Sequence, residues 1–275
     1  MRVDVIIKWL AIAACGAALV FGQAQPPRPK SQQEAQAIQA VFQAPDPDSR
    51  IKAGNELLTK YADTEFKAII FQVIAMSYQQ KNDSENMIIF AERTLEADPK
   101  NYSAMLMLAG ALAQRTREFD LDKEEKLGRA EKLANEALEV IKVAAKPNPS
   151  VTDEQWEAAK KDASAEAFSA LGMAAGARKK HDDAIKNFKL AIETASQPDT
   201  VTMVRLGATY NIAGKPDDAI AILDKVMSDP QAPVQIKQFA QAERARAIQA
   251  KGGAKPAASP APAAPAPPPA AAPKP

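Results

Sequence analysis

Small and large apolar residues recur at fixed offsets over two amphipathic stretches between residues 166 and 193. The pattern reads Phe168-x-x-Leu171-Gly172, followed by Ala184-x-x-x-Phe188-x-x-Ala191. The residues between the stretches, 178–183, are all polar, which is typical of an exposed turn. The pattern therefore predicts a helical hairpin. In it, Gly172 and Ala184 let the two helices approach closely, Phe188 fills the remaining space, and Asp182 or Asp183 caps the second helix.

The same pattern follows again after residue 200. It reads Met203-x-x-Leu206-Gly207-x-x-Tyr210, followed by Ala219-x-x-x-Leu223-x-x-Val226. Gly207 follows Gly172 by 35 positions, and Ala219 follows Ala184 by the same number. Two independent positions that share one offset predict an internal repeat. A single hairpin of this length cannot bury its own apolar face, so neighbouring copies must stack on each other.

Earlier copies are less regular. A clear one covers 68–101 and reads Phe71-x-x-Ile74-Ala75-x-x-Tyr78, then Met87-x-x-x-Ala91. A degenerate copy covers 34–67, where Ala53, Leu57 and Lys60 stand at the offsets of Ala184, Phe188 and Ala191, and the lysine departs from the pattern. The copy at 102–144 has nine extra residues between its helices, in an insertion at 115–128 rich in charge. This insertion is interpreted either as an exposed, salt-bridged loop or extended helix ends, or as a protrusion that contacts a partner.

Prolines divide the rest of the chain. Lys146-Pro147-Asn148-Pro149 interrupts the array, and Thr152-x-x-Gln155 then predicts a capping box. Residues 152–164 either lengthen the next helix or form a separate connecting helix. Residues 234–251 predict a polar capping helix with Ile236, Phe239 and Ile248 on one face, and the Ala/Pro-rich residues 252–275 predict a disordered tail.

The N-terminus predicts export. Basic residues precede an unbroken apolar run of 13 residues from Trp9 to Phe21, which suits a signal peptide better than a membrane span. Three outcomes are weighed for residues 1–24: cleavage after Ala24, lipidation at Cys15, or retention as an anchor. Residues 25–33 follow as an extended spacer. The chain is therefore predicted to act in the periplasm or in association with the cell envelope.

These repeats resemble those of tetratricopeptide-repeat (TPR) proteins. The resemblance implies an all-α, right-handed superhelix of about five helical hairpins with a C-terminal capping helix, and an activity of protein–protein binding. The first helix of each hairpin is expected to line a concave groove, and Ala208 stands at one of the groove offsets. Ten further side chains are assigned to the groove: Gln72, Met76, Gln79, Gln80, Leu106, Gln114, Ser169, Met173, Val204 and Asn211. The lysine and asparagine set with which some relatives hold a terminal carboxylate is missing at these offsets.

Composition argues against catalysis and against nucleic-acid binding. The chain has one histidine, His181, and one cysteine, so few side chains suit acid–base or metal chemistry. We expect no enzyme activity, no cofactor and no metal. The 35 basic and 34 acidic residues leave a net charge of +1 with no strongly basic stretch, which disfavours nucleic acid. Two functions are considered: an envelope scaffold that binds other proteins, and a periplasmic carrier or regulatory subunit for a small molecule or cell-wall polymer.

Overall fold

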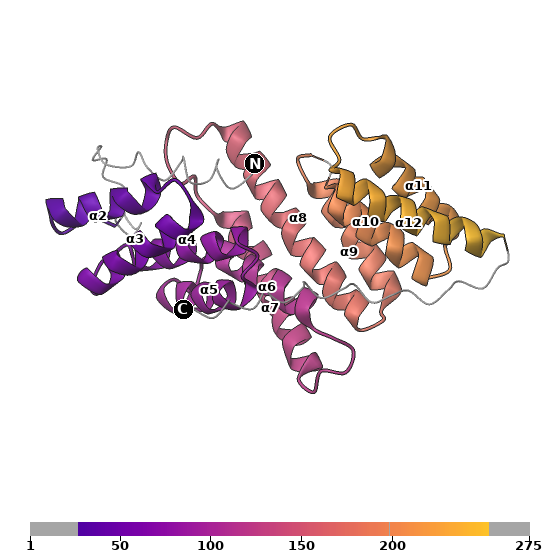
Figure 1. Ribbon diagram of the computed structural model, residues 1–275, viewed down its shortest axis with the longest axis horizontal. Coiled ribbons are helices and arrows are strands. Elements are labelled where there is room, and N and C mark those ends of the chain that lie inside the picture. Colours follow the sequence, from indigo (N-terminus) through magenta and orange to yellow (C-terminus); the bar gives the residue numbers. More distant parts are fainter. Residues whose placement is uncertain (1–26, 198, 253–275) are drawn as a thin grey trace, which may run out of the picture.

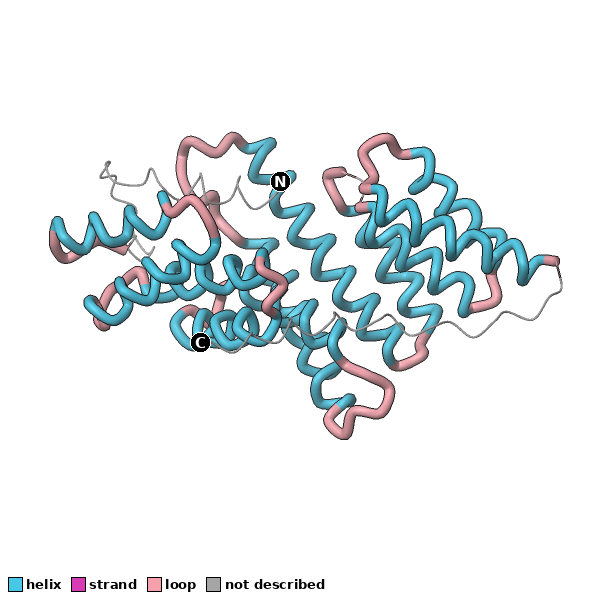
Figure 2. Tube along the Cα trace, viewed as in Figure 1, coloured by secondary structure: helices cyan, strands magenta, loops and turns pink. Residues whose placement is uncertain are grey.

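The computed structural model describes residues 27–197 and 199–252, and these form eleven helices without a strand (Figures 1 and 2). The expected signal segment 1–24 and nearly all of the expected tail lie outside the described residues. The helices are α2 (Gln32–Gln43), α3 (Pro47–Lys60), α4 (Lys67–Gln80), α5 (Ser84–Ala97), α6 (Tyr102–Arg115), α7 (Lys123–Val143), α8 (Asp153–Ala177), α9 (His181–Thr194), α10 (Thr200–Ile212), α11 (Pro216–Ser228) and α12 (Val234–Lys251).

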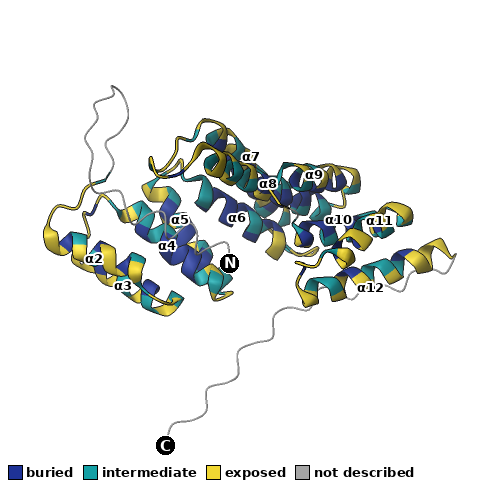
Figure 3. Cartoon of the chain, turned by 90° about the horizontal axis from the view of Figure 1, so that it is seen from above, coloured by how far each residue is buried: buried dark blue, intermediate teal, exposed yellow. Residues whose placement is uncertain are grey.

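The helices are arranged as five successive antiparallel pairs followed by α12. Each helix packs on the next one along the chain, while α8 also packs on α6 and α12 packs on α10. Seen from above, the array is curved, with α2 at one end and α12 at the other (Figure 3). The predicted all-α solenoid of stacked hairpins is confirmed. None of the described helices is long and apolar enough to cross a membrane.

Local sequence explains where most helices begin. The side chains of Asp46, Asp83, Asn101 and Thr152 each accept a hydrogen bond from a backbone N–H of the following first turn. The predicted capping box is present, because Thr152 and Gln155 satisfy each other's backbone. The predicted cap of α9 is wrong. This helix begins at His181 and Lys180 is its N-cap, so Asp182 and Asp183 lie inside the first turn.

The extra residues of the array lengthen helices. Residues 153–177 form one continuous helix of 25 residues, so of the two alternatives for residues 152–164 the structure shows the lengthened helix and no separate connecting helix. Trp156 fixes its start, because the indole Nε1 donates to the Ala144 carbonyl at 3.3 Å. The insertion divides between a loop at 116–122 and the first turns of α7, which has 21 residues.

The core is shared between neighbouring pairs. One large cluster of buried apolar residues extends from α2 to α8, and smaller clusters join α6 to α8, α8 to α10 and α10 to α12. At the C-terminal end the packed face of α12 is made by Ala240 and Ala247, which are fully buried. Phe239 and Ile248, which were expected to share one face of this helix with Ile236, are exposed. The alanines of α12 therefore pack against the end of the array, and the side chains of Phe239 and Ile248 remain accessible.

Candidate partner-binding surface

Three of the ten predicted groove residues are buried in the array. Met76 and Leu106 belong to the large core cluster, with 9% and 3% of their surface exposed. Ser169 is also buried, and its Oγ lies 3.2 Å from Oγ1 of Thr202 on α10. These three buried side chains pack between neighbouring helices and offer almost no surface to a partner.

Three polar members of the predicted groove bind the neighbouring repeat. The Gln72 side-chain oxygen accepts from Asn101 at 2.9 Å, and that of Gln80 accepts from Arg50 at 3.3 Å. Asn211 donates from Nδ2 to the Glu243 backbone carbonyl at 2.9 Å and to its carboxylate at 3.0 Å. These amides hold the pairs in register, since each bond crosses from one repeat to another.

The remaining four members keep some access to solvent. Gln79 and Gln114 are exposed, and Met173 and Val204 are half-buried. Accessible predicted residues therefore lie on α4, α6, α8 and α10, and the assignment of these positions to partner binding stays a prediction.

A stripe on α10 extends this accessible surface. Val201, Arg205, Ala208 and Ile212 are spaced four, three and four residues apart, which places them on one face of the helix. We call them the α10 stripe. Val201 and Ile212 are exposed, whereas the opposite face of α10 packs into the core through buried residues such as Leu206. Only Ala208 of this stripe was among the predicted groove offsets.

Arg205 is the charged member of the α10 stripe. Burial lowers the pKa of its guanidinium, and the nearby Asp199 carboxylate opposes this shift. Asp199 itself accepts from the Val201 backbone N–H and from the Thr202 hydroxyl. Among the described residues, no hydrogen bond or ion pair reaches the Arg205 guanidinium. Sequence reasoning missed this residue, although its place on the stripe beside Ala208 would have identified it.

The neighbouring first helices repeat the stripe. On α12, Phe239 and Ala242 follow Arg205 and Ala208 by 34 positions, and the Phe239 side chain is 63% exposed. On α8, Met173 and Ala177 precede Ala208 and Ile212 by 35 positions. Three parallel helices therefore present small and apolar side chains, with Arg205 among them.

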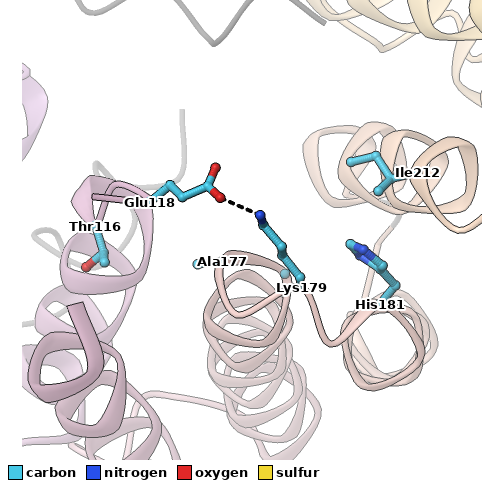
Figure 4. A pocket seen from close by; sticks show the side chains of 7 residues that line it. Thr116, Glu118, Ala177, Lys179, His181 and Ile212 are labelled. Atoms are coloured by element: carbon cyan, nitrogen blue, oxygen red, sulfur yellow. Dashed lines mark hydrogen bonds and ion pairs between the residues drawn. The ribbon is translucent and has the colours of Figure 1, made fainter. Parts of the chain in front are cut away.

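A hollow of about 330 Å³ lies at one end of the α10 stripe (Figure 4). Its walls come from the 116–122 loop, the end of α8, the turn into α9 and the end of α10. The lining residues are Thr116, Glu118, Gly176, Ala177, Lys179, His181 and Ile212. Lys179 pairs with Glu118 across one side, and the imidazole of His181 lies opposite Ile212 (Figure 4).

Within residues 27–197 and 199–252, no three His, Cys, Asp or Glu side chains gather to hold a metal ion. His181 has Lys179, Lys180 and two aspartates beside it in the turn. The absence of catalysis stays an expectation.

Stacked antiparallel helical pairs of this kind define the class of α-solenoid repeat proteins. Within that class, residues 68–101 match the family model described as a tetratricopeptide repeat. The fold is also that of a thermophilic TPR protein of Thermus thermophilus. That structure matches with a TM-score of 0.50 and 12% identity, over 77% of this chain and 95% of the other. The chain therefore contains a tetratricopeptide repeat at residues 68–101 and has the fold of a tetratricopeptide-repeat array, and such arrays generally serve as scaffolds that bind other proteins.

Two further solved structures show a weaker likeness. The MamA protein matches with 21% identity over 68% of this chain and 89% of the other, at a TM-score of 0.38. An assembly chaperone of RpL4 matches with 11% identity over 82% of this chain and 99% of the other, at a TM-score of 0.43. Both TM-scores are too low to establish a common overall shape. No curated protein matches the chain.

Proposed function

We propose that the protein is a scaffold that holds a segment of a partner protein across the α10 stripe and the neighbouring face of α12. The observation that carries this proposal is the position of Arg205, which is half-buried on the α10 stripe between exposed Val201 and Ile212 and whose guanidinium no described carboxylate contacts directly. A partner that covers this guanidinium would remove it from water, which is costly unless the charge is then paired. A carboxylate on the partner would supply the missing pair, so the preferred segment is apolar with an acidic residue.

The surroundings of Arg205 favour such a segment. Val201 and Ile212 are exposed on the same stripe, and Phe239 is exposed on the next first helix. Aromatic and arginine side chains contribute most of the binding energy at protein interfaces. Ala208 and Ala242 leave room for close approach of a peptide backbone or a helix.

Site-specific photo-crosslinking in cells tests the surface. A photoreactive amino acid at Phe239 should capture one defined protein, whereas the same group at Ile89, exposed on α5, should not. Arg205→Met should weaken binding of that protein about tenfold, as expected for loss of one charge pair at an interface. The fold should persist, because the substitution removes an unpaired charge. Equal capture from both positions, or unchanged binding by Arg205→Met, would contradict the proposal.

We further propose that the scaffold acts outside the cytoplasm, associated with the cell envelope. The support is the apolar run from Trp9 to Phe21 behind a basic start, a composition that directs export. Fusion of alkaline phosphatase after residue 252 tests this location, since the enzyme becomes active only after export. Activity should vanish when Leu19 and Val20 are replaced by aspartate. If the photoreactive group at Phe239 captures a glycan and no protein, the result would favour the carrier function instead.

A further inference from the structure

The hollow and Arg205 belong to one surface, because Ile212 is a member of the α10 stripe and also lines the hollow. Arg205 and Ile212 are seven residues apart on one helix, which corresponds to two turns and to about 10 Å along its axis. Between them stands Ala208, so no long side chain of the stripe separates the guanidinium from the hollow. A partner segment that reaches Arg205 can therefore reach the hollow as well.

Ion pairs within the chain hold the walls of the hollow in place. Lys179 pairs with Glu118 across one side. The side chain of Arg178 is 12% exposed and binds Glu124 at 2.7 Å and Glu131 at 2.5 Å, which ties the end of α8 to α7. These charges are balanced inside the molecule, so the hollow is shaped by the chain itself. A preformed site of this kind loses little conformational entropy when a side chain enters it.

The hollow suits a large apolar side chain. Gly176, Ala177 and Ile212 give it apolar walls on the α8 and α10 sides, and its polar groups come from the 116–122 loop and the turn into α9. An apolar cavity of about 150 Å³ can accept a benzene molecule. At about 330 Å³, the hollow has room for a phenylalanine ring. Phe119 and Leu121 of the loop are exposed and do not line the hollow, so they take no part in this site.

We propose that the partner segment is an amphipathic helix, with an acidic residue against Arg205 and a large apolar residue seven positions away that enters the hollow. This inference deepens the proposed function and rests on it. Charge fixes the acidic position, since no described carboxylate contacts the Arg205 guanidinium. In a helix, residues seven positions apart share one face and lie about 10 Å apart, which matches the separation of Arg205 and Ile212. The small side chains of Ala177, Ala208 and Ala242, on three neighbouring helices, leave room for such a helix.

Extended segments fit this spacing less well. In a β-strand the residue three positions away lies at about 10 Å, but its side chain points to the opposite side. A polyproline-type segment repeats every three residues, yet such segments dock in grooves lined with aromatic rings. Phe239 is the only aromatic side chain on α12, whose residues 234–251 are all described, and the α10 stripe has none. The surface therefore favours a helix.

Selection from a displayed library of helical peptides tests the spacing. Each peptide would carry random residues along one face of an alanine-rich helix, and the full-length chain would be the bait. Peptides enriched on the wild-type chain should pair an aspartate or glutamate with a large apolar residue seven positions away. On Ile212→Gln they should lose the apolar preference and keep the acidic one, and on Arg205→Met the reverse. Ile89→Gln, at an exposed position of α5, is the matched control and should give the wild-type result.

Fluorescence anisotropy then measures the most enriched peptide. Ile212→Gln should weaken its binding about tenfold, as expected when the apolar contact of one side chain is lost. Moving the apolar residue of the peptide from seven to four positions away should weaken binding to the wild-type chain equally, because the side chain stays on the same face but does not reach the hollow. The moved residue should have no further effect on Ile212→Gln. Circular dichroism should show unchanged helical content in this variant, since Ile212 is exposed.

The outcomes separate this inference from the proposed function. Enriched peptides that keep an acidic residue but show no fixed spacing, or that keep their apolar residue on Ile212→Gln, would overturn the helix in the hollow and leave the Arg205 surface in place. A spacing of three residues would overturn it in favour of an extended segment. Identical enrichment on the wild type and Arg205→Met, or no enrichment on the wild type, would overturn both.

Discussion

Gly172 on α8 leaves no room for a side chain against Phe188 on α9. A Cβ atom placed on Gly172 would lie 2.6 Å from Cδ1 of the Phe188 ring, which is closer than carbon atoms approach in proteins. The next pair repeats the relationship, with a Cβ on Gly207 lying 2.7 Å from Cδ2 of Leu223. In both pairs a glycine sets how closely the helices approach, and a buried apolar side chain fills the space.

Gly172→Ala should therefore destabilise the protein. Overpacking a core costs about 1–3 kcal/mol, and alanine returns about 1 kcal/mol through its higher helix propensity, which leaves a net loss of up to about 2 kcal/mol. Urea unfolding monitored by circular dichroism measures the change. Gly110→Ala on α6 is the control: a Cβ there meets no atom within 4 Å, so stability should rise by up to about 1 kcal/mol. A stabilising Gly172→Ala would mean that Phe188 moves aside freely.

A second prediction concerns the turn between the helices of a pair. Asn82, Lys179 and Gly214 hold equivalent turn positions with φ of 57°, 60° and 70°. In each turn the following N–H donates to a carbonyl five residues back, as at a Schellman helix end. Left-handed backbone favours glycine, so Lys179→Gly should stabilise the protein by up to about 1 kcal/mol and Gly214→Ala should destabilise it by about as much.

Thermal unfolding measures both turn variants. The lost Lys179 pair with Glu118 should matter little, because both side chains are well exposed. Lys180→Gly provides the control, since Lys180 has an ordinary φ of −85° and gains nothing from glycine. If Lys179→Gly and Lys180→Gly shifted the midpoint equally, backbone strain at Lys179 would be excluded.

The sequence predicted the fold because the repeat depends on a few positions with strict steric demands. Two of these positions are the glycines that approach the second helix closely, Gly172 and Gly207, and two are fully buried alanines, Ala184 and Ala219. Because only small residues fit there, their spacing in the sequence predicts which helices pair. The capping box at Thr152 is similarly local, since it needs only four consecutive residues. The cap of α9 was misplaced because the helix already begins at His181, one residue before Asp182 and two residues before Asp183.

The binding surface was less predictable, because it depends on how far each helix is rotated. Met76 and Leu106 stand at groove offsets but are buried by the packing of neighbouring pairs. The exposure of Phe119 and Leu121 depends on the shape of the loop, which local composition does not reveal. The position of Arg205 three residues before Ala208 could have placed it on the stripe, but the lack of a carboxylate in contact with it is a property of the folded surroundings.

A third prediction concerns the loss of folding stability at acid pH. The pKa of Asp46 is lowered chiefly by the Ser49 backbone N–H and also by the Ser49 hydroxyl, at 2.8 and 2.7 Å, and the pKa of Asp83 is lowered similarly by Asn86. A carboxyl whose pKa is lower in the folded state binds fewer protons there than in the unfolded chain. Its stabilisation is present above the unfolded pKa of about 4 and is lost as pH falls through the folded value.

Urea unfolding should therefore show constant stability near neutral pH and a progressive loss below about pH 4. Asp46→Asn should reduce this acid-dependent loss, because the amide oxygen still caps α3 but does not ionise. Asp46→Ala should destabilise the protein at neutral pH as well, since the cap is removed. Identical pH profiles for the wild type and Asp46→Asn would show that this cap does not contribute to acid sensitivity.

The final prediction concerns the end of the array. The helix α12 covers Leu223 and Val226, which are fully buried, and its Arg244 pairs with Asp224 at 2.5 Å. A chain that ends after residue 233 should lose roughly 3–6 kcal/mol, the cost of exposing two large apolar side chains. A chain that ends after residue 252 should keep the wild-type unfolding midpoint, since Ala/Pro-rich composition adds no core. Equal midpoints for the two truncated chains would show that α12 does not act as the terminal cap. If only the shorter chain becomes insoluble, the result would support a capping role for α12.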